Sequence, residues 1–224
     1  INPIFTNEGI KKIKHLSKKY SIKIKTLTGD CFMQKPFWKT KKSKISKLQN
    51  NFLNIINESA KVGIKFIILP LVDNGKIENK KQEMILVSFL KKIYPILRKN
   101  KLKILFESDF APKKYLKFIK KFNPNLIGIN YDTGNSASLG FDAKSEISIY
   151  GKYINNVHIK DRVYKGKTVE LGKGNADFSV IFEKLKQIKY KGNFILQGAR
   201  SQKKQDAKIL IKYRDFVIKF LKKN

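Results

Sequence analysis

Four apolar runs of the sequence end in a polar side chain that could take part in chemistry. The runs and their polar ends are LFES with Glu107, INYD with Asp132, VHIKD with His158 and Asp161, and FILQ with Gln197. A buried carboxylate costs several kcal/mol unless a cation or strong hydrogen-bond donors compensate it. Asp132 therefore either belongs to an ordinary polar turn with Thr133, Gly134 and Asn135, or it holds a ligand.

The side chains at three of these ends form a mixed set of oxygen and nitrogen ligands. Glu107, Asp132 and His158 would suit Mn²⁺, Mg²⁺, Co²⁺ or Zn²⁺. In this interpretation Gly134 lets the chain turn behind Asp132, and Asn135 offers an amide to the same pocket. The alternative for His158 is a satisfied core histidine, because it lies inside an apolar run, whereas His15 lies in a lysine-rich segment and is expected in solvent.

Short apolar runs alternate with helical patterns along the chain. We expect strands at residues 22–28, 64–70, 102–107, 126–132, 154–161 and 193–197. The helices are expected where apolar side chains recur every three or four residues: Ile10, Ile13 and Leu16; Ile45, Leu48, Phe52, Ile55 and Ile56; Leu86, Phe89, Leu90, Ile93 and Leu97; Tyr115, Phe118 and Ile119; Phe178, Ile181, Phe182 and Leu185; Tyr213, Phe216, Val217 and Phe220. This alternation predicts a parallel α/β sheet with helices outside it. Because the polar residues come at the carboxyl ends of different strands, a TIM (β/α)8-type barrel is favoured over an open sheet.

Composition limits the remaining possibilities. With 224 residues, 42% of them hydrophobic, the chain can bury one sizeable core, so residues 1–224 are expected to form a single domain. No apolar run approaches the roughly 20 residues of a membrane span, and Cys31 is the only cysteine, which agrees with a soluble protein of the cytoplasm. Dinucleotide-binding, P-loop and nucleophile-elbow motifs are absent.

The formal net charge of +32 invites a nucleic-acid interpretation. Only four of the 49 basic residues are arginines, although arginine is the usual reader of phosphates and base edges. The lysines are spread over the whole chain rather than gathered in one tail or stripe. We therefore expect nucleic acid to be an unlikely partner despite the charge.

Several motifs resemble one known family. FES, YDTGN, NNVHIKDR, the segment LGKGNADFSVIFEKLKQIKYKGNFILQGAR and the early IKTLTGDCFM are similar to the sugar phosphate isomerase/epimerase family, whose fold is the xylose-isomerase-like TIM barrel. The ordered series D-x-G-N, H-x-K-D and G-x-G-x-x-D-F is the most specific part of this resemblance.

The resemblance implies a divalent metal held by Glu107, Asp132, His158 and Gln197, with Glu107 and Gln197 in the catalytic positions. The family usually has a glutamate at the last position, and glutamine is neutral and cannot act as a base. A single base, for which Glu107 is the candidate and Asp161 or Glu170 a substitute, favours aldose–ketose isomerisation through an enediolate over two-base epimerisation.

The substrate implied by the resemblance is a small sugar or sugar phosphate. The residues expected to contact it are Asn135, Lys160, Arg162, Gly172, Gly174 and Arg200, with the two glycines presenting backbone N–H groups. Asp161 is expected to orient His158 or to cap the following loop.

The family barrel has eight strands, and six are visible here, so we expect about two strands before Ile1. Two other functions stay open at this point. One is a metal-dependent endonuclease or another nucleic-acid-binding protein, and the other is a noncatalytic sugar-binding relic. Assembly into a homo-oligomer is also possible.

Overall fold

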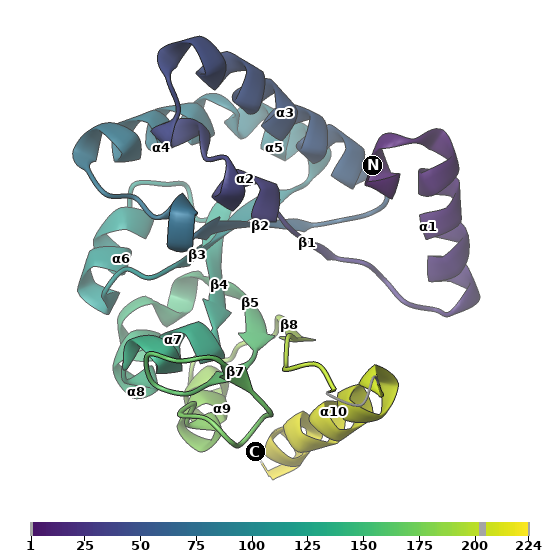
Figure 1. Cartoon of the computed structure of the whole chain (residues 1–224), viewed down its shortest axis with the longest axis vertical. Coiled ribbons are helices and arrows are strands. Elements are labelled where there is room, and N and C mark those ends of the chain that lie inside the picture. Colours follow the sequence, from purple (N-terminus) through teal and green to yellow (C-terminus); the bar gives the residue numbers. More distant parts are fainter. Residues whose placement is uncertain (1, 202–204, 224) are drawn as a thin grey trace. The chain divides into compact units, whose positions relative to one another are not determined.

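The computed structural model describes residues 2–201 and 205–223, coloured along the chain in Figure 1. Contacts within the chain group it into two compact units, which are residues 1–108 with 121–128, and residues 109–120 with 129–224. In the part of the chain that the structure describes, no helix is long and apolar enough to cross a membrane.

The first unit is built on three parallel strands. These are β1 (Thr26–Thr28), β2 (Phe66–Leu71) and β3 (Lys103–Ser108), in that sheet order. The segments around them are η1 (Pro3–Phe5), α1 (Asn7–Lys19), α2 (Asp30–Gln34), η2 (Phe37–Lys39), α3 (Lys42–Lys61), η3 (Asp73–Gly75), α4 (Lys80–Lys92) and α5 (Tyr94–Asn100). Figure 1 shows α3, α4 and α5 together on one side of these strands.

Aromatic rings close the space between the helices of the first unit. Phe37 meets the rings of Phe52 and Phe89 at centroid distances of 6.2 and 4.8 Å, edge to face. All three side chains are buried, and large buried aromatic rings are a major source of stability in a core of this size. This core supports β2 and β3, and thereby the carboxyl end of β3, where Glu107 lies.

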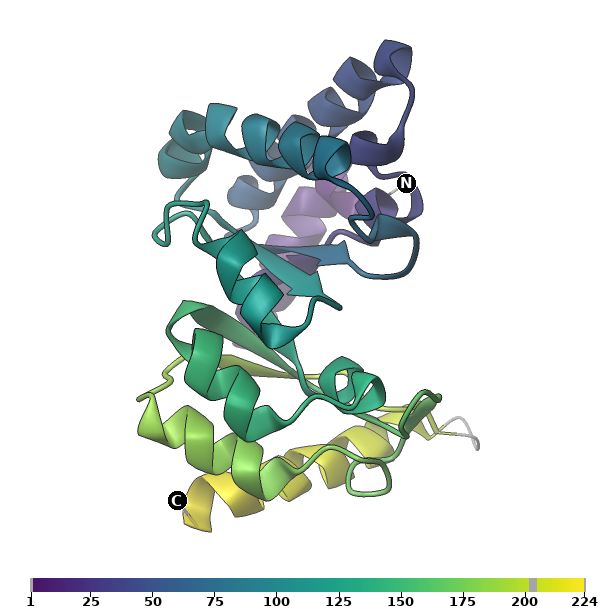
Figure 2. The same ribbon diagram turned by 90° about the vertical axis from the view of Figure 1, so that its left-hand side faces the viewer.

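The second unit also has three parallel strands, in the order β4 (Ile127–Asp132), β5 (Ile154–Ile159) and β8 (Asn193–Leu196). Its other elements are α6 (Pro112–Ile119), α7 (Thr133–Leu139), α8 (Ala143–Tyr150), η4 (Gly151–Tyr153), α9 (Phe178–Gln187) and α10 (Asp206–Lys223). A short antiparallel hairpin, β6 (Asp161–Arg162) with β7 (Thr168–Val169), follows β5. The outer helices pack in chain order, α6 against α8, α8 against α9, and α9 against α10 (Figure 2).

The six expected parallel strands are confirmed, with changes at their ends. The first strand begins at Thr26 rather than residue 22, because Ile22 and Ile24 lie exposed outside the sheet. The fifth strand ends at Ile159, and Asp161 opens the separate hairpin.

Two expectations about helices need correction. The apolar series from Leu86 to Leu97 does not form one helix, because α4 ends before Ile93 and α5 starts anew with Pro95 in its first turn. Proline has no N–H to continue the preceding helix, so it belongs at a helix start. Three further helices, α2, α7 and α8, were not expected from the apolar pattern.

Candidate active site

The candidate site of the second unit begins with two neighbouring strand ends. Asp132 on β4 is paired in register with His158 on β5, and both side chains are buried. The Oδ2 atom of Asp132 lies 3.8 Å from Nδ1 of His158. Because side chains alternate along a strand, Asn130 and Asn156 lie on the same face one layer below, where the Asn156 amide donates to the Asn130 carbonyl at 2.7 Å.

Asp132 has two separate roles for its two oxygens. The Oδ1 atom accepts a hydrogen bond from the backbone N–H of Asn135 at 2.7 Å, so the side chain caps the amino end of α7. The Oδ2 atom faces His158 and the Nζ atom of Lys160, which is 3.4 Å away. The expected polar turn after β4 is therefore the first turn of a helix, and one carboxylate oxygen remains directed at the site.

Opposing effects set the charge of Asp132. Burial raises the pKa of the carboxyl, but the imidazole of His158 and the ammonium of Lys160 outweigh it, so the pKa lies below its ordinary value of 3.8. The group is consequently a carboxylate at neutral pH. A buried, ionised oxygen beside a histidine ring is suited to bind a cation.

The segments that follow β4 and β5 interlock. The Thr133 hydroxyl donates to the carbonyl of Lys160 at 2.6 Å and accepts from its N–H at 3.0 Å. A Cβ atom on Gly134 would lie 2.6 Å from Cγ of Lys160 and 3.0 Å from its backbone carbonyl carbon, so only glycine permits this close approach. D-T-G-N and H-I-K-D, which the sequence analysis singled out as separate motifs, thus form one packed structure.

The side chain of Asn135 accepts hydrogen bonds from two cationic side chains. Its Oδ1 atom accepts from Nζ of Lys160 at 3.2 Å and from Nη1 of Arg162 at 2.9 Å. Arg162 is also tied to the chain itself, because Nε and Nη2 donate to the carbonyl of Gly166 at 3.0 and 2.7 Å. Lys160 is the more available of the two cations for a substrate, and Arg162 mainly fixes the hairpin.

Asp161 caps the loop after the hairpin, which was one of its two expected roles. Its Oδ2 atom accepts from the N–H groups of Gly172 and Gly174, both at 2.9 Å, and Oδ1 accepts from Ala176 at 3.1 Å. The N–H groups of the two glycines, which we expected to face the substrate, therefore point at a carboxylate of the chain. A buried carboxylate with three donors is well compensated.

The other predicted residues lie in different surroundings. Glu107 is buried near the end of β3, in the first unit. Gln197 follows β8 and is exposed, with its N–H bound to the carbonyl of Ile159 at 2.9 Å. Glu170 is ion-paired with Lys212 at 2.6 Å, and this contact lowers its pKa, so it is a poor substitute base.

Asp132 and His158, two of the predicted metal ligands, form a buried pair in the second unit. A carboxylate and an imidazole fit a divalent cation that accepts mixed oxygen and nitrogen ligands. His15 is exposed on α1, as expected.

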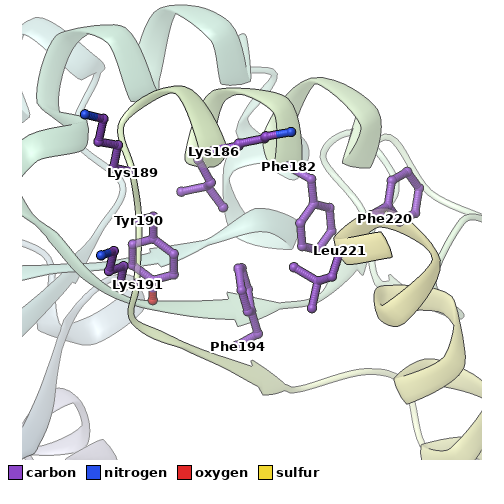
Figure 3. A pocket seen from close by; sticks show the side chains of 9 residues that line it. Phe182, Lys186, Lys189, Tyr190, Lys191, Phe194, Phe220 and Leu221 are labelled. Atoms are coloured by element: carbon purple, nitrogen blue, oxygen red, sulfur yellow. The ribbon is translucent and has the colours of Figure 1, made fainter. Parts of the chain in front are cut away.

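Two cavities of the second unit are lined by residues other than Asp132 and His158. A cavity of about 680 Å³ is bordered by the β6–β7 hairpin, the loop after it and the segment after β8, and Arg200, Lys167 and Lys173 line it. An apolar cavity of about 250 Å³ lies beside the loop that precedes β8 (Figure 3). Its described lining is aromatic, aliphatic and lysine side chains, without a carboxylate or imidazole, so it offers no metal ligand or carboxylate base for catalysis.

Sequence reasoning missed a buried carboxyl group on α8. Glu146 accepts a hydrogen bond from the Tyr150 hydroxyl at 2.6 Å and from the Tyr131 hydroxyl at 3.1 Å, and Ser136 also binds it. These four residues are spread over 20 positions of the chain without a recognisable motif. Burial raises the pKa of Glu146 above its ordinary value of 4.5.

The comparison with known families settles what kind of chain this is. The sequence pattern of the family described as xylose isomerase-like TIM barrel matches residues 3–215. The chain belongs to this family. Its six parallel strands with outer helices are part of the eight-stranded barrel that defines the fold.

Solved structures show the same xylose isomerase-like fold at low sequence identity. A xylose isomerase domain protein from Planctomyces limnophilus superposes with a TM-score of 0.79 at 16% identity, over 97% of this chain and 84% of that one. The IolI protein with a bound zinc atom gives 0.73 at 17% identity, over 93% and 82%. The 3-keto-D-glucoside 4-epimerase YcjR from E. coli gives 0.71 at 16% identity, over 96% and 85%.

A relative in sequence is the uncharacterized protein MJ1311 of Methanocaldococcus jannaschii. It is 27% identical over 105 residues, which are 46% of this xylose isomerase-like chain and 36% of the relative. The match thus spans about a third of that protein's length.

Proposed function

We propose that the protein is a divalent-metal-dependent isomerase or epimerase that acts on a sugar or sugar phosphate by removing a proton next to a carbonyl group. The observation that carries this proposal is the buried, ionised Asp132 beside His158 at the carboxyl ends of two parallel strands. Active sites of TIM barrels gather at this end of the strands. Glu107, near the carboxyl end of its own strand, supplies the third ligand in the proposal.

The proposed chemistry divides between the ion and the chain. A bound divalent ion would polarise the carbonyl and a neighbouring hydroxyl of an open-chain sugar, which makes the intervening C–H acidic. Glu107 is the proposed base that removes this proton and returns it to the neighbouring carbon on the same face, and Lys160 is the proposed donor to a substrate oxygen that gains negative charge. Gln197, the proposed fourth ligand, can offer its carbonyl oxygen but cannot accept a proton as a base.

The remote end of the substrate is proposed to lie in the cavity of about 680 Å³ that Arg200 lines. Lys167 and Lys173 add two positive charges to its wall, and the Glu170 carboxylate there is already paired with Lys212. This charge balance supports a phosphorylated substrate over a neutral one. The zinc in the IolI structure and the epimerase activity named for YcjR support the same class of function.

Solvent deuterium exchange tests the proposal. With Mn²⁺ and a panel of ketoses with and without phosphate, the full chain is expected to incorporate deuterium at the carbon next to the carbonyl, on one face only, because Glu107 is the single base. The Gln197→Glu variant is expected to bind Mn²⁺ more tightly, since it adds a negative charge, while its exchange stays on one face at a similar or lower rate.

The stereochemistry of the exchanged carbon, read by NMR, distinguishes the outcomes. Exchange on both faces in the unmodified chain would contradict the one-base proposal. Deuterium exchange on a second face that occurs only in Gln197→Glu would identify the protein as a former two-base epimerase. Bound Mn²⁺ without exchange on any sugar in either variant would favour a noncatalytic sugar-binding protein.

Lys160 gives a second prediction about the proposed metal. Its ammonium lies 3.4 Å from Oδ2 of Asp132, where it repels a second cation. Lys160→Met keeps the aliphatic stem against Gly134 and is expected to tighten Mn²⁺ binding about tenfold, measured by calorimetry at low ionic strength. Lys165→Met, on the hairpin that follows Lys160, is the control, and weaker binding in Lys160→Met would show that the lysine supports the site instead.

A further inference from the structure

Glu146 binds the segment that carries the proposed ligand Asp132, on the side opposite the site. It lies on α8 and only 3% of its surface is exposed. Its partner Tyr131 immediately precedes Asp132, and its partner Ser136 immediately follows Asn135. Two of its hydrogen bonds therefore bracket the Asp132–Asn135 turn.

The geometry separates this network from the site face of the strand. Successive side chains of a strand point to opposite faces, so Tyr131 points away from the face on which Asp132 and His158 lie. Glu146 reaches the Tyr131 hydroxyl from the helix layer, and the Tyr150 hydroxyl, one turn further along α8, donates to its other oxygen. The contacts hold β4 and α7 against α8 without occupying the site.

A buried carboxyl group that joins a strand to two helices costs desolvation free energy. Burial disfavours its charged form, as the raised pKa of Glu146 shows, and apolar side chains of similar volume often stabilise a core as well or better. Hydrogen bonds are directional, whereas apolar contacts tolerate small shifts. The arrangement therefore suits the accurate placement of the turn more than stability alone.

We propose that Glu146 is a positioning residue that fixes the Asp132–Asn135 turn from the side opposite the site. It thereby holds the Asp132 carboxylate and the side-chain carbonyl oxygen of Asn135 in the orientation that the site requires. This inference rests on the proposed function, because Asp132 is taken there as a metal ligand. Outer partners of metal ligands commonly affect metal affinity by 10- to 100-fold.

The test compares Glu146→Leu and Glu146→Gln with Asp142→Ala. Asp142 caps the same helix at its exposed start, where its side chain accepts a 2.8 Å bond from the Ser145 N–H, and its backbone carbonyl, which the substitution keeps, accepts from the Glu146 N–H at 3.0 Å. Glu146→Leu is expected to weaken Mn²⁺ binding about tenfold or more and to speed hydrogen exchange at the Asn135 N–H, with Glu146→Gln intermediate. Asp142→Ala is expected to lower the melting temperature while its Mn²⁺ affinity stays within about twofold.

Mn²⁺ affinity in Glu146→Leu within about twofold of the unmodified chain, together with unchanged exchange at Asn135, would overturn the proposal. If Glu146→Leu does not fold, the double variant Tyr131→Phe with Ser136→Ala removes the same two bonds and replaces it. If the unmodified chain and Asp132→Asn bind Mn²⁺ equally, the proposed metal site fails instead. In that case the hydrogen-exchange rate of the Asn135 N–H still tests whether Glu146 fixes the turn.

Discussion

Asp132→Asn is expected to reduce Mn²⁺ affinity at least a hundredfold and to abolish deuterium exchange, while the free energy of unfolding changes little. Asparagine caps a helix as well as aspartate does, so the bond from the Asn135 N–H to the side-chain oxygen is retained. The negative charge beside His158 is lost. Calorimetric titration with Mn²⁺ and chemical unfolding measure the two quantities separately.

Asp132→Ala is the matched comparison. It removes the charge and also the cap of α7, so it is expected to lose about 1 kcal/mol of unfolding free energy in addition to metal binding. If Asp132→Asn bound Mn²⁺ as tightly as the unmodified chain, Asp132 would be a helix cap only, and the polar-turn interpretation of this segment would be correct.

Gly134→Ala is expected to lower the free energy of unfolding by about 1 to 3 kcal/mol and to disable the site. Helix propensity alone predicts the opposite, since alanine is better than glycine inside a helix by about 1 kcal/mol. The close contact decides the sign, because the new Cβ would lie 3.0 Å from the backbone carbon of Lys160 and 2.6 Å from its Cγ. The backbone of the neighbouring strand end must shift to make room.

Urea unfolding and Mn²⁺ titration of Gly134→Ala measure both effects. Gly63→Ala provides a contrast, because no atom lies within 4 Å of its added Cβ, and its cost comes only from a positive φ of 85°. A more stable Gly134→Ala protein with unchanged Mn²⁺ affinity would show that the two motifs are not tightly joined.

The sequence predicts the ends of the strands well and the helices after β4 poorly. The apolar runs before Glu107, Asp132 and His158 are long enough to predict strands, and parallel pairing then follows from alternation with helices. Helix α7 has the sequence TGNSASL, whose first four residues have low helix propensity, so no pattern predicts it. It forms because Asp132 caps it and because its residues are buried against the hairpin.

Other parts of the site depend on contacts that no spacing reveals. Glu146 meets Tyr131 and Ser136 from a separate helix, and periodicity says nothing about such a meeting. The glycines of the G-K-G segment were expected to serve a ligand, but the acceptor of their N–H groups is Asp161, from the motif that also contains His158. A short motif can predict which backbone N–H groups are donors, but their acceptors are known only from the fold.

The anchoring of the β6–β7 hairpin has a consequence for how its tip can change. Asp161 holds the loop after the hairpin through three N–H groups, and the Asn175 N–H binds the carbonyl of Arg162. The tip is itself tied to the segment after β4, because the Gly166 carbonyl accepts from Arg162, which also binds Asn135, and the Lys165 N–H donates to the carbonyl of Ser138. An exchanged tip would therefore have to keep the contacts of Gly166 and Lys165 for the Asp132–Asn135 turn to stay in place.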